Sequence, residues 1–121
     1  MNKILLAILT AILFVPGLAM AAPGKITILS PADGAMVEPG FTFKLKYKAV
    51  PGTNGNHLHL SVDGKMVAMI HELKGTTDIW PLTPGKHKIC LSIQTKEHAS
   101  TGVEQCINVM TSKSMSMHMP M

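Results

Sequence analysis

The chain has 121 residues, a net charge of +4 that rests wholly on lysine, and an aromatic content of only 4%. Because the lysines are scattered and no arginine is present to make bidentate contacts, the composition argues against a nucleic-acid-binding protein. The length allows one domain, whose core we expect to be built from Val, Ile and Leu together with the rings of Phe41, Phe43, Tyr47 and Trp80.

The N-terminal segment has the three parts of a bacterial signal peptide. Lys3 supplies a basic start, the apolar run 4–15 follows, and Ala19-Met20-Ala21 fits a cleavage site. This run is shorter than the roughly 20 residues that a helix needs to span a bilayer. We therefore expect residues 1–21 to be a signal peptide that is removed on export to the periplasm or the outside of the cell. The mature protein is then not expected to be attached to a membrane.

The rest of the chain alternates between apolar and polar residues with a period of two, as β-strands do. The clearest case is 41–48, where Phe43, Leu45 and Tyr47 share one face and lysines the other. The pattern predicts an all-β, seven-stranded, immunoglobulin-like antiparallel sandwich over residues 22–110. The predicted strands are 25–29, 41–48, 57–62, 65–71, 76–82, 86–95 and 103–110.

Two turn motifs support this fold. Asp63-Gly64 lies between two predicted strands and indicates a hairpin with a type I′ turn. The segment 82–87, Leu-Thr-Pro-Gly-Lys-His, resembles the corner between the fifth and sixth strands of fibronectin type III and bacterial immunoglobulin-like domains. Where that corner usually has Tyr, this chain has His87, for which the resemblance implies a structural, hydrogen-bonding role rather than a ligand role.

Both cysteines fall on the outer face of the last two predicted strands. A register that sets Cys90 opposite Cys106 also pairs Ile89 with Ile107 and Ile93 with Val103. The sequence therefore predicts a disulfide within this hairpin, in keeping with an oxidising compartment. A redox-active or copper-binding thiol pair is the alternative, but the chain has no Cys-x-x-Cys spacing.

Four histidines converge on one end of the predicted sandwich. His57 and His59 project from the outer face or rim of one strand about 7 Å apart, with Leu58 and Leu60 pointing inward. His98 lies in the last hairpin loop at the same end, and a two-residue loop at Asp63-Gly64 would pair His57 with Ile70 and bring His71 there as a weaker fourth. The arrangement suits imidazole ligands of Cu(II), or of zinc as the alternative.

The C-terminal segment 111–121 has no period that would bury its methionines, and we expect it to be a disordered Met/His-rich tail. Thioethers that alternate with small polar residues are soft ligands suited to Cu(I), and an imidazole among them can also take Cu(II). The candidate ligands are Met115, Met117, His118, Met119 and Met121.

The tail resembles the Met/His-rich segments of periplasmic copper-handling proteins, and the whole is similar in outline to CopC-like copper-resistance proteins. Those proteins use a histidine at the mature N-terminus, whereas this chain would start at Ala22. The same difference argues against the histidine brace of copper mono-oxygenases. The His-Leu-His strand with a histidine in the last hairpin loop looks closer to His-containing periplasmic immunoglobulin-like domains, whose resemblance implies no activity.

Two functions from different classes fit these features. The first is a periplasmic copper carrier, buffer or chaperone, a monomer whose partners would be a cuproprotein or a copper exporter. The second is an interaction module without a metal, which binds a partner protein or an envelope component through an exposed strand. An enzyme is not expected, because the seven acidic residues are dispersed and neither Gly-x-Ser-x-Gly nor His-Glu-x-x-His occurs.

Overall fold

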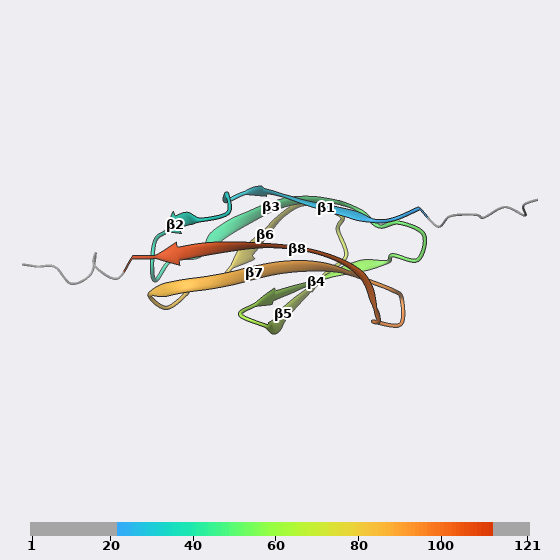
Figure 1. Ribbon diagram of the computed structural model, residues 1–121. Coiled ribbons are helices and arrows are strands. Elements are labelled where there is room, and N and C mark those ends of the chain that lie inside the picture. The colour runs from blue at the N-terminus through green and yellow to red at the C-terminus, as the bar shows by residue number, and fades with distance from the viewer. Residues whose placement is uncertain (1–21, 113–121) are drawn as a thin grey trace, which may run out of the picture.

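The computed structural model describes residues 22–112, which fold into eight β-strands (Figure 1). The predicted signal peptide and residues 113–121 lie outside the described residues. The described part of the chain contains no helix that is long and apolar enough to cross a membrane. The strands are β1 (Lys25–Ser30), β2 (Ala35–Val37), β3 (Phe43–Val50), β4 (His57–Val62), β5 (Lys65–Ile70), β6 (Lys74–Ile79), β7 (Gly85–Gln94) and β8 (Ser100–Thr111).

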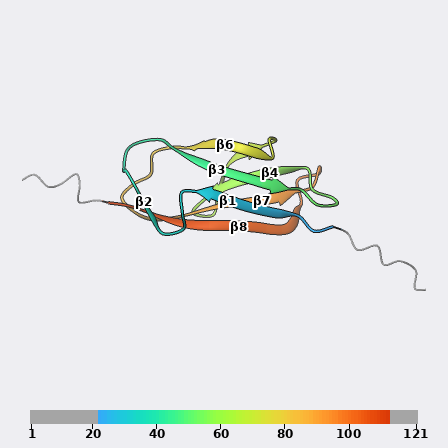
Figure 2. The ribbon, with the colours of Figure 1, turned by 90° about the horizontal axis from the view of Figure 1, so that it is seen from above.

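The strands form two sheets that pack as a sandwich, as the alternating pattern predicts. The smaller sheet has the order β1-β3-β6 and the larger has the order β2-β8-β7-β4-β5. Seen from above, β1, β3 and β6 lie side by side (Figure 2). β1 contacts β8 on one side of the sandwich, whereas β5 and β6 are the edge strands on the other.

The eighth strand, β2, corrects the predicted count of seven and the fully antiparallel topology. β2 pairs with β8 in parallel, with Ala35 opposite Val109. Two hydrogen bonds between the preceding turn and β8 fix it there: Gly34 N donates to Asn108 O (2.7 Å), and Asn108 N donates to the Asp33 carboxylate (2.8 Å). A strand of three residues is too short to show alternation, so the sequence pattern could not reveal it.

Among the described residues, the hydrophobic core is aliphatic apart from the buried phenol ring of Tyr47. Tyr47 packs among buried leucines and isoleucines, and its hydroxyl donates to the carbonyl of Glu72 (2.9 Å). The prediction that Phe41 and Trp80 belong to the core is wrong, because these side chains are 64% and 77% exposed. β3 begins only at Phe43 and β6 ends at Ile79, so both rings lie just beyond the paired strands.

The hairpin of β4 and β5 has the predicted turn but an irregular ladder. Asp63 and Gly64 have φ angles of 52° and 84°, and Val62 pairs with Lys65, which confirms a two-residue type I′ turn. Between Leu60 and Ser61 the register shifts, so Ile70 pairs with Leu58 and not with His57 as predicted. The bulge therefore moves every β5 residue beyond it by one position.

The disulfide Cys90–Cys106 is present and joins β7 to β8, as predicted. Cys90 lies opposite Cys106 and Ile89 opposite Ile107, so the register inferred from the hydrophobic pattern is confirmed at these pairs. Towards the loop the ladder becomes irregular between Ser92 and Gln94. The predicted pair of Ile93 and Val103 falls in this irregular stretch.

His87 links three segments at the end of the sandwich where β7 begins. Its Nδ1 lies 2.6 Å from Asp63 Oδ2 and its Nε2 lies 2.7 Å from the carbonyl oxygen of Thr83. Both partners are acceptors, so the two contacts are hydrogen bonds together only when the ring is an imidazolium that donates from both nitrogens. The hydrogen bond to Asp63 raises the pKa of His87, in agreement with its predicted structural role.

This link predicts a pH-dependent contribution to stability. The pKa of His87 is higher in the folded state than in the unfolded chain. Its contribution to the free energy of unfolding is therefore fully present below about pH 6.5 and is lost as pH rises through the raised pKa. Asp63→Asn should lower the free energy of unfolding by about 1 kcal/mol near pH 6, a figure reduced for the half-exposed carboxylate. Chemical denaturation of wild type and variant between about pH 6 and 8 measures both effects.

The matched control is Asp78→Asn, which removes an ion pair with Lys44 whose two side chains are both exposed. Such a pair contributes about 0–1 kcal/mol, and its contribution should not change as His87 titrates. Equal pH dependence of Asp63→Asn and the wild type would contradict the role given to His87.

Candidate metal centre

The loop before β4 determines where the first histidine lies. Asn56 N donates to Gln94 O (2.8 Å), which joins the end of this loop to β7. A Cβ atom at Gly55 would clash with the carbonyl oxygen of Pro51, so the backbone can turn this tightly only with glycine. The position of His57, the first residue of β4, is therefore fixed by a tightly packed turn.

His57 and His59 lie two residues apart on β4 and share its outer face, because residues i and i+2 project to the same side of a strand. His57 is nevertheless only 1% exposed, although it lies on the predicted outer face. The reason is that other imidazoles cover it. Its ring centroid lies 5.0 Å from that of His59, 5.2 Å from that of His71 and 4.7 Å from that of His98.

His98 reaches this cluster from the loop between β7 and β8. Backbone hydrogen bonds from His98 N to Thr95 O and from Thr95 N to Ala99 O, both 2.8 Å, close the loop. His98 has a φ of 69°, a left-handed conformation that costs a residue with a side chain about 1–2 kcal/mol. Backbone strain of this kind often marks a functional position.

The ring nitrogens of these three residues converge. The Nε2 atoms of His57 and His59 lie 3.2 Å apart, and one ligand atom each from His57, His59 and His98 all lie within 4.8 Å of one another. Two nitrogens bound tetrahedrally to one ion at about 2.05 Å would lie about 3.3 Å apart. The spacing of the first pair therefore already suits a shared ion.

Asn56 fixes which nitrogen of His57 faces the cluster. The Asn56 carbonyl oxygen Oδ1 lies 3.0 Å from His57 Nδ1, so this nitrogen carries the proton and donates it. The Nε2 of His57 then carries no proton, and its lone pair points at His59. Both Nε2 atoms can bind one ion once His59 carries its proton on Nδ1.

Burial and mutual repulsion keep the central imidazoles neutral. Burial lowers the pKa of His57, and the neighbouring rings of His98, His59 and His71 lower it further. Burial and then His98 also lower the pKa of His59. Because only a neutral imidazole can bind a metal, both residues are in the binding form at neutral pH.

Two further side chains approach the site because of the bulge in the β4–β5 hairpin. The shifted register pairs Leu58 with Ile70 and so places the next residue, His71, beside His57, on which it stacks with an interplanar angle of 26°. The same shift sets Met69 opposite His59, where an undisturbed ladder would set Ala68. Met69 is 44% exposed and shares the face of His59, so it offers a thioether that the sequence pattern did not indicate.

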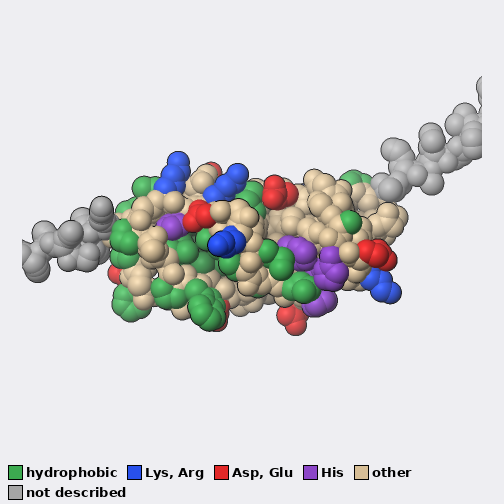
Figure 3. All heavy atoms as spheres, turned by 90° about the horizontal axis from the view of Figure 1, so that it is seen from below, with side chains coloured by type: hydrophobic (Ala, Val, Ile, Leu, Met, Phe, Trp, Pro, Cys, Tyr) green, Lys and Arg blue, Asp and Glu red, His purple; other side chains and the backbone are tan. Residues whose placement is uncertain are grey.

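Figure 3 shows histidine side chains gathered in one patch on the face that lies lowest in Figure 1. The predicted ligands His57, His59, His98 and His71 are thus brought together. Cys90, Cys106 and Glu104 also lie close to one another. The two cysteines form a disulfide, so neither sulfur is a thiolate that could bind a metal. The other predicted ligands lie outside the described residues, namely Met115, Met117, His118, Met119 and Met121.

Comparison with known proteins defines the fold. The chain is similar to the fibronectin(III)-like modules of Clostridium thermocellum CbhA, with 15% identity and a TM-score of 0.60 over 72% of this chain and 96% of that chain. The fold is a fibronectin type III-like β-sandwich. The sandwich is also similar to part of an engineered protein, with 18% identity and a TM-score of 0.52 over 74% of this chain and 20% of that one.

No protein-family model and no curated protein matches the sequence. At these identities the structural similarity defines the architecture and no activity. The fibronectin type III-like sandwich therefore provides a scaffold, and the function has to be argued from the side chains that this chain carries on it.

The electrostatics of the cluster predict the order in which the histidines titrate. His57 and His59 should gain protons below about pH 6.5, whereas His87 should do so above it. Two-dimensional NMR of the imidazole C–H signals in the metal-free protein measures each midpoint. A midpoint for His57 at or above that of an exposed histidine would contradict the burial described for its ring.

Proposed function

We propose that this protein binds a transition-metal ion, with Cu(II) as the preferred ion, through His57, His59 and His98. The observation that carries the proposal is the convergence of one ring nitrogen from each of the three residues within 4.8 Å. His57 is held in one tautomer by Asn56, and a fixed ligand loses less entropy on binding. The protein would act as an exported copper carrier, buffer or chaperone.

The donor set favours copper over other ions. Imidazole nitrogens suit copper and zinc, and the affinity of such a site for divalent ions rises to a maximum at Cu(II). The exposed thioether of Met69 opposite His59 adds a softer donor at the edge of the site. Zinc remains the second ion to test, since it also takes three imidazoles.

The methionine-rich segment supplies a second, softer set of donors for Cu(I) in this proposal. β8 begins next to the loop of His98 and is 12 residues long, so Thr111 lies about 37 Å from its start. The ten residues that follow Thr111 reach at most about 36 Å when fully extended. The segment is therefore proposed to bind Cu(I) independently and not to deliver it to the histidines of its own chain.

An interaction module is the second candidate, and two observations favour it. The fold is one of fibronectin type III-like modules, and β5 is an edge strand that pairs with β4 on one side only. Met66 and Val67 are exposed on this strand, and an exposed apolar edge is a surface to which an extended peptide can add. The partner in this case would be a protein or an envelope component.

The folded site is tested by calorimetric titration of Cu(II) and Zn(II) into the mature protein. The double variant His57→Ala, His59→Ala should lose the high-affinity site, whereas His118→Ala, which keeps the folded cluster, should retain it. Binding by the wild type should weaken as pH falls below about 6.5, because protons then compete for the imidazoles. Equal affinity of the double variant and the wild type would refute the proposal.

His98→Gly separates metal binding from folding. Glycine adopts the φ of 69° without strain, so the free energy of unfolding should stay the same or rise slightly. Loss of one of three ligands should lower the affinity for Cu(II) by at least about tenfold. A stable variant with wild-type affinity would remove His98 from the site.

The soft site is tested by truncation after Ser112. Thr111 is buried in β8 and its hydroxyl bonds to Thr83 O, so the sandwich extends one residue past the predicted boundary at 110 and the truncation must keep it. In competition with a Cu(I) chelator, the truncated protein should lose Cu(I) binding yet remain folded. If both proteins compete equally, the methionines have no copper role.

A further inference from the structure

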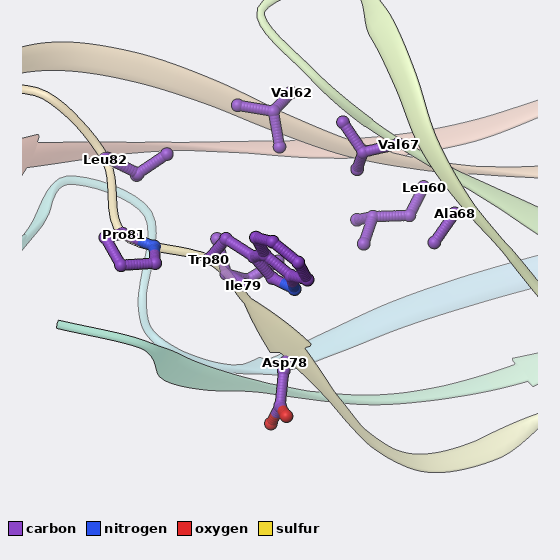
Figure 4. Close-up of a pocket in the computed structure, with 9 residues that line it drawn as sticks. All are labelled: Leu60, Val62, Val67, Ala68, Asp78, Ile79, Trp80, Pro81 and Leu82. Atoms are coloured by element: carbon purple, nitrogen blue, oxygen red, sulfur yellow. The ribbon is translucent and has the colours of Figure 1, made fainter.

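An apolar pocket of about 430 Å³ opens between the edge strands β5 and β6. Leu60, Val62, Val67 and Ala68 come from the larger sheet, while Ile79 and Trp80 come from the end of β6 and the residue after it (Figure 4). Pro81 and Leu82 continue the wall, and the carboxylate of Asp78 points away from the other side chains (Figure 4). The lining is therefore almost wholly hydrophobic.

Trp80 makes this pocket unusual. It lines the pocket but is 77% exposed, and it is the only tryptophan of the chain. Val67 is also more than half exposed on the neighbouring edge. A pocket that leaves a large indole ring in water is a surface that apolar groups would cover favourably.

The chain leaves the sandwich beside this pocket. The hydroxyl of Thr111, at the end of β8, donates to the carbonyl of Thr83 (2.7 Å) and lies 3.3 Å from the carbonyl oxygen of Gly85. Thr83 directly follows Leu82, which forms part of the pocket wall. Nine residues remain beyond Ser112, and they can reach about 30 Å when extended.

We propose that the pocket beside Trp80 is the docking site of the chain's own C-terminal segment, residues 113–121, through its methionine side chains. Methionine is unbranched and flexible, fills irregular apolar spaces and makes favourable sulfur contacts with aromatic rings. The segment has four methionines at every second position and no acidic residue. Its attachment at Thr111 gives it a millimolar effective concentration at the pocket, so even weak contacts suffice.

The single tryptophan reports this docking directly. Acrylamide quenching of Trp80 fluorescence is measured for the mature protein, for the truncation after Ser112, and for a variant with Met115, Met117, Met119 and Met121 replaced by Ser. The quenching constant should rise by at least about twofold in the truncated protein, since a segment that shields Trp80 for half of the time halves the accessible population. The methionine-to-serine variant should match the truncation, whereas His118→Ala should match the wild type.

Three results would overturn the proposal. Equal quenching of the mature and truncated proteins would show that the segment does not cover Trp80. If the quenching constant of His118→Ala equalled that of the truncated protein, the methionines would not be the groups that anchor the segment. Shielding that disappears on dilution would identify a second copy of the chain as the occupant. Because all measurements use metal-free protein with an intact histidine cluster, failure here leaves the proposed metal site unaffected.

Discussion

Burial of a single imidazole, that of His57, is the constraint on which the candidate site depends. The ring lies on the outer face of β4, where a side chain would ordinarily meet water, and three other imidazoles replace that water. Asn56 satisfies Nδ1 and His59 satisfies Nε2, so no polar atom of the buried ring lacks a partner. Burial thereby fixes the tautomer of His57 and directs the lone pair of its Nε2 at His59.

This arrangement costs stability in ways that an ordinary surface would avoid. Rings that repel one another when protonated are packed together, which lowers the pKa of His57 and His59, and His98 is held at a positive φ. Below about pH 6.5 the unfolded chain binds protons that these two residues resist, so the cluster destabilises the fold in acid. Local costs of this kind are typical of functional sites, in keeping with the proposed metal centre.

Much of the fold could be predicted from the sequence because the side chains of a strand alternate between its two faces, which gives the sequence a period of two. Alternation located seven of the eight strands, and one register satisfied both the cysteines and Ile89 with Ile107. The same topology predicted that His57, His59 and His98 would meet. The bulge between Leu60 and Ser61, which brings Met69 opposite His59, leaves no signature in the alternation and could not be predicted. Nor could the hydrogen bond that Asn56 accepts from His57, or the exposure of Trp80, since both depend on where strands end in three dimensions.

Binding of one ion between His57, His59 and His98 can be tested by crystallography of the mature protein soaked with copper or zinc. Anomalous scattering at the absorption edge of the metal locates the ion without reference to any assumed ligand. We expect an anomalous peak about 2.0–2.1 Å from Nε2 of both His57 and His59 and from a ring nitrogen of His98. A fully occupied peak elsewhere on the sandwich, or an empty cluster in crystals that hold the metal at other sites, would contradict it.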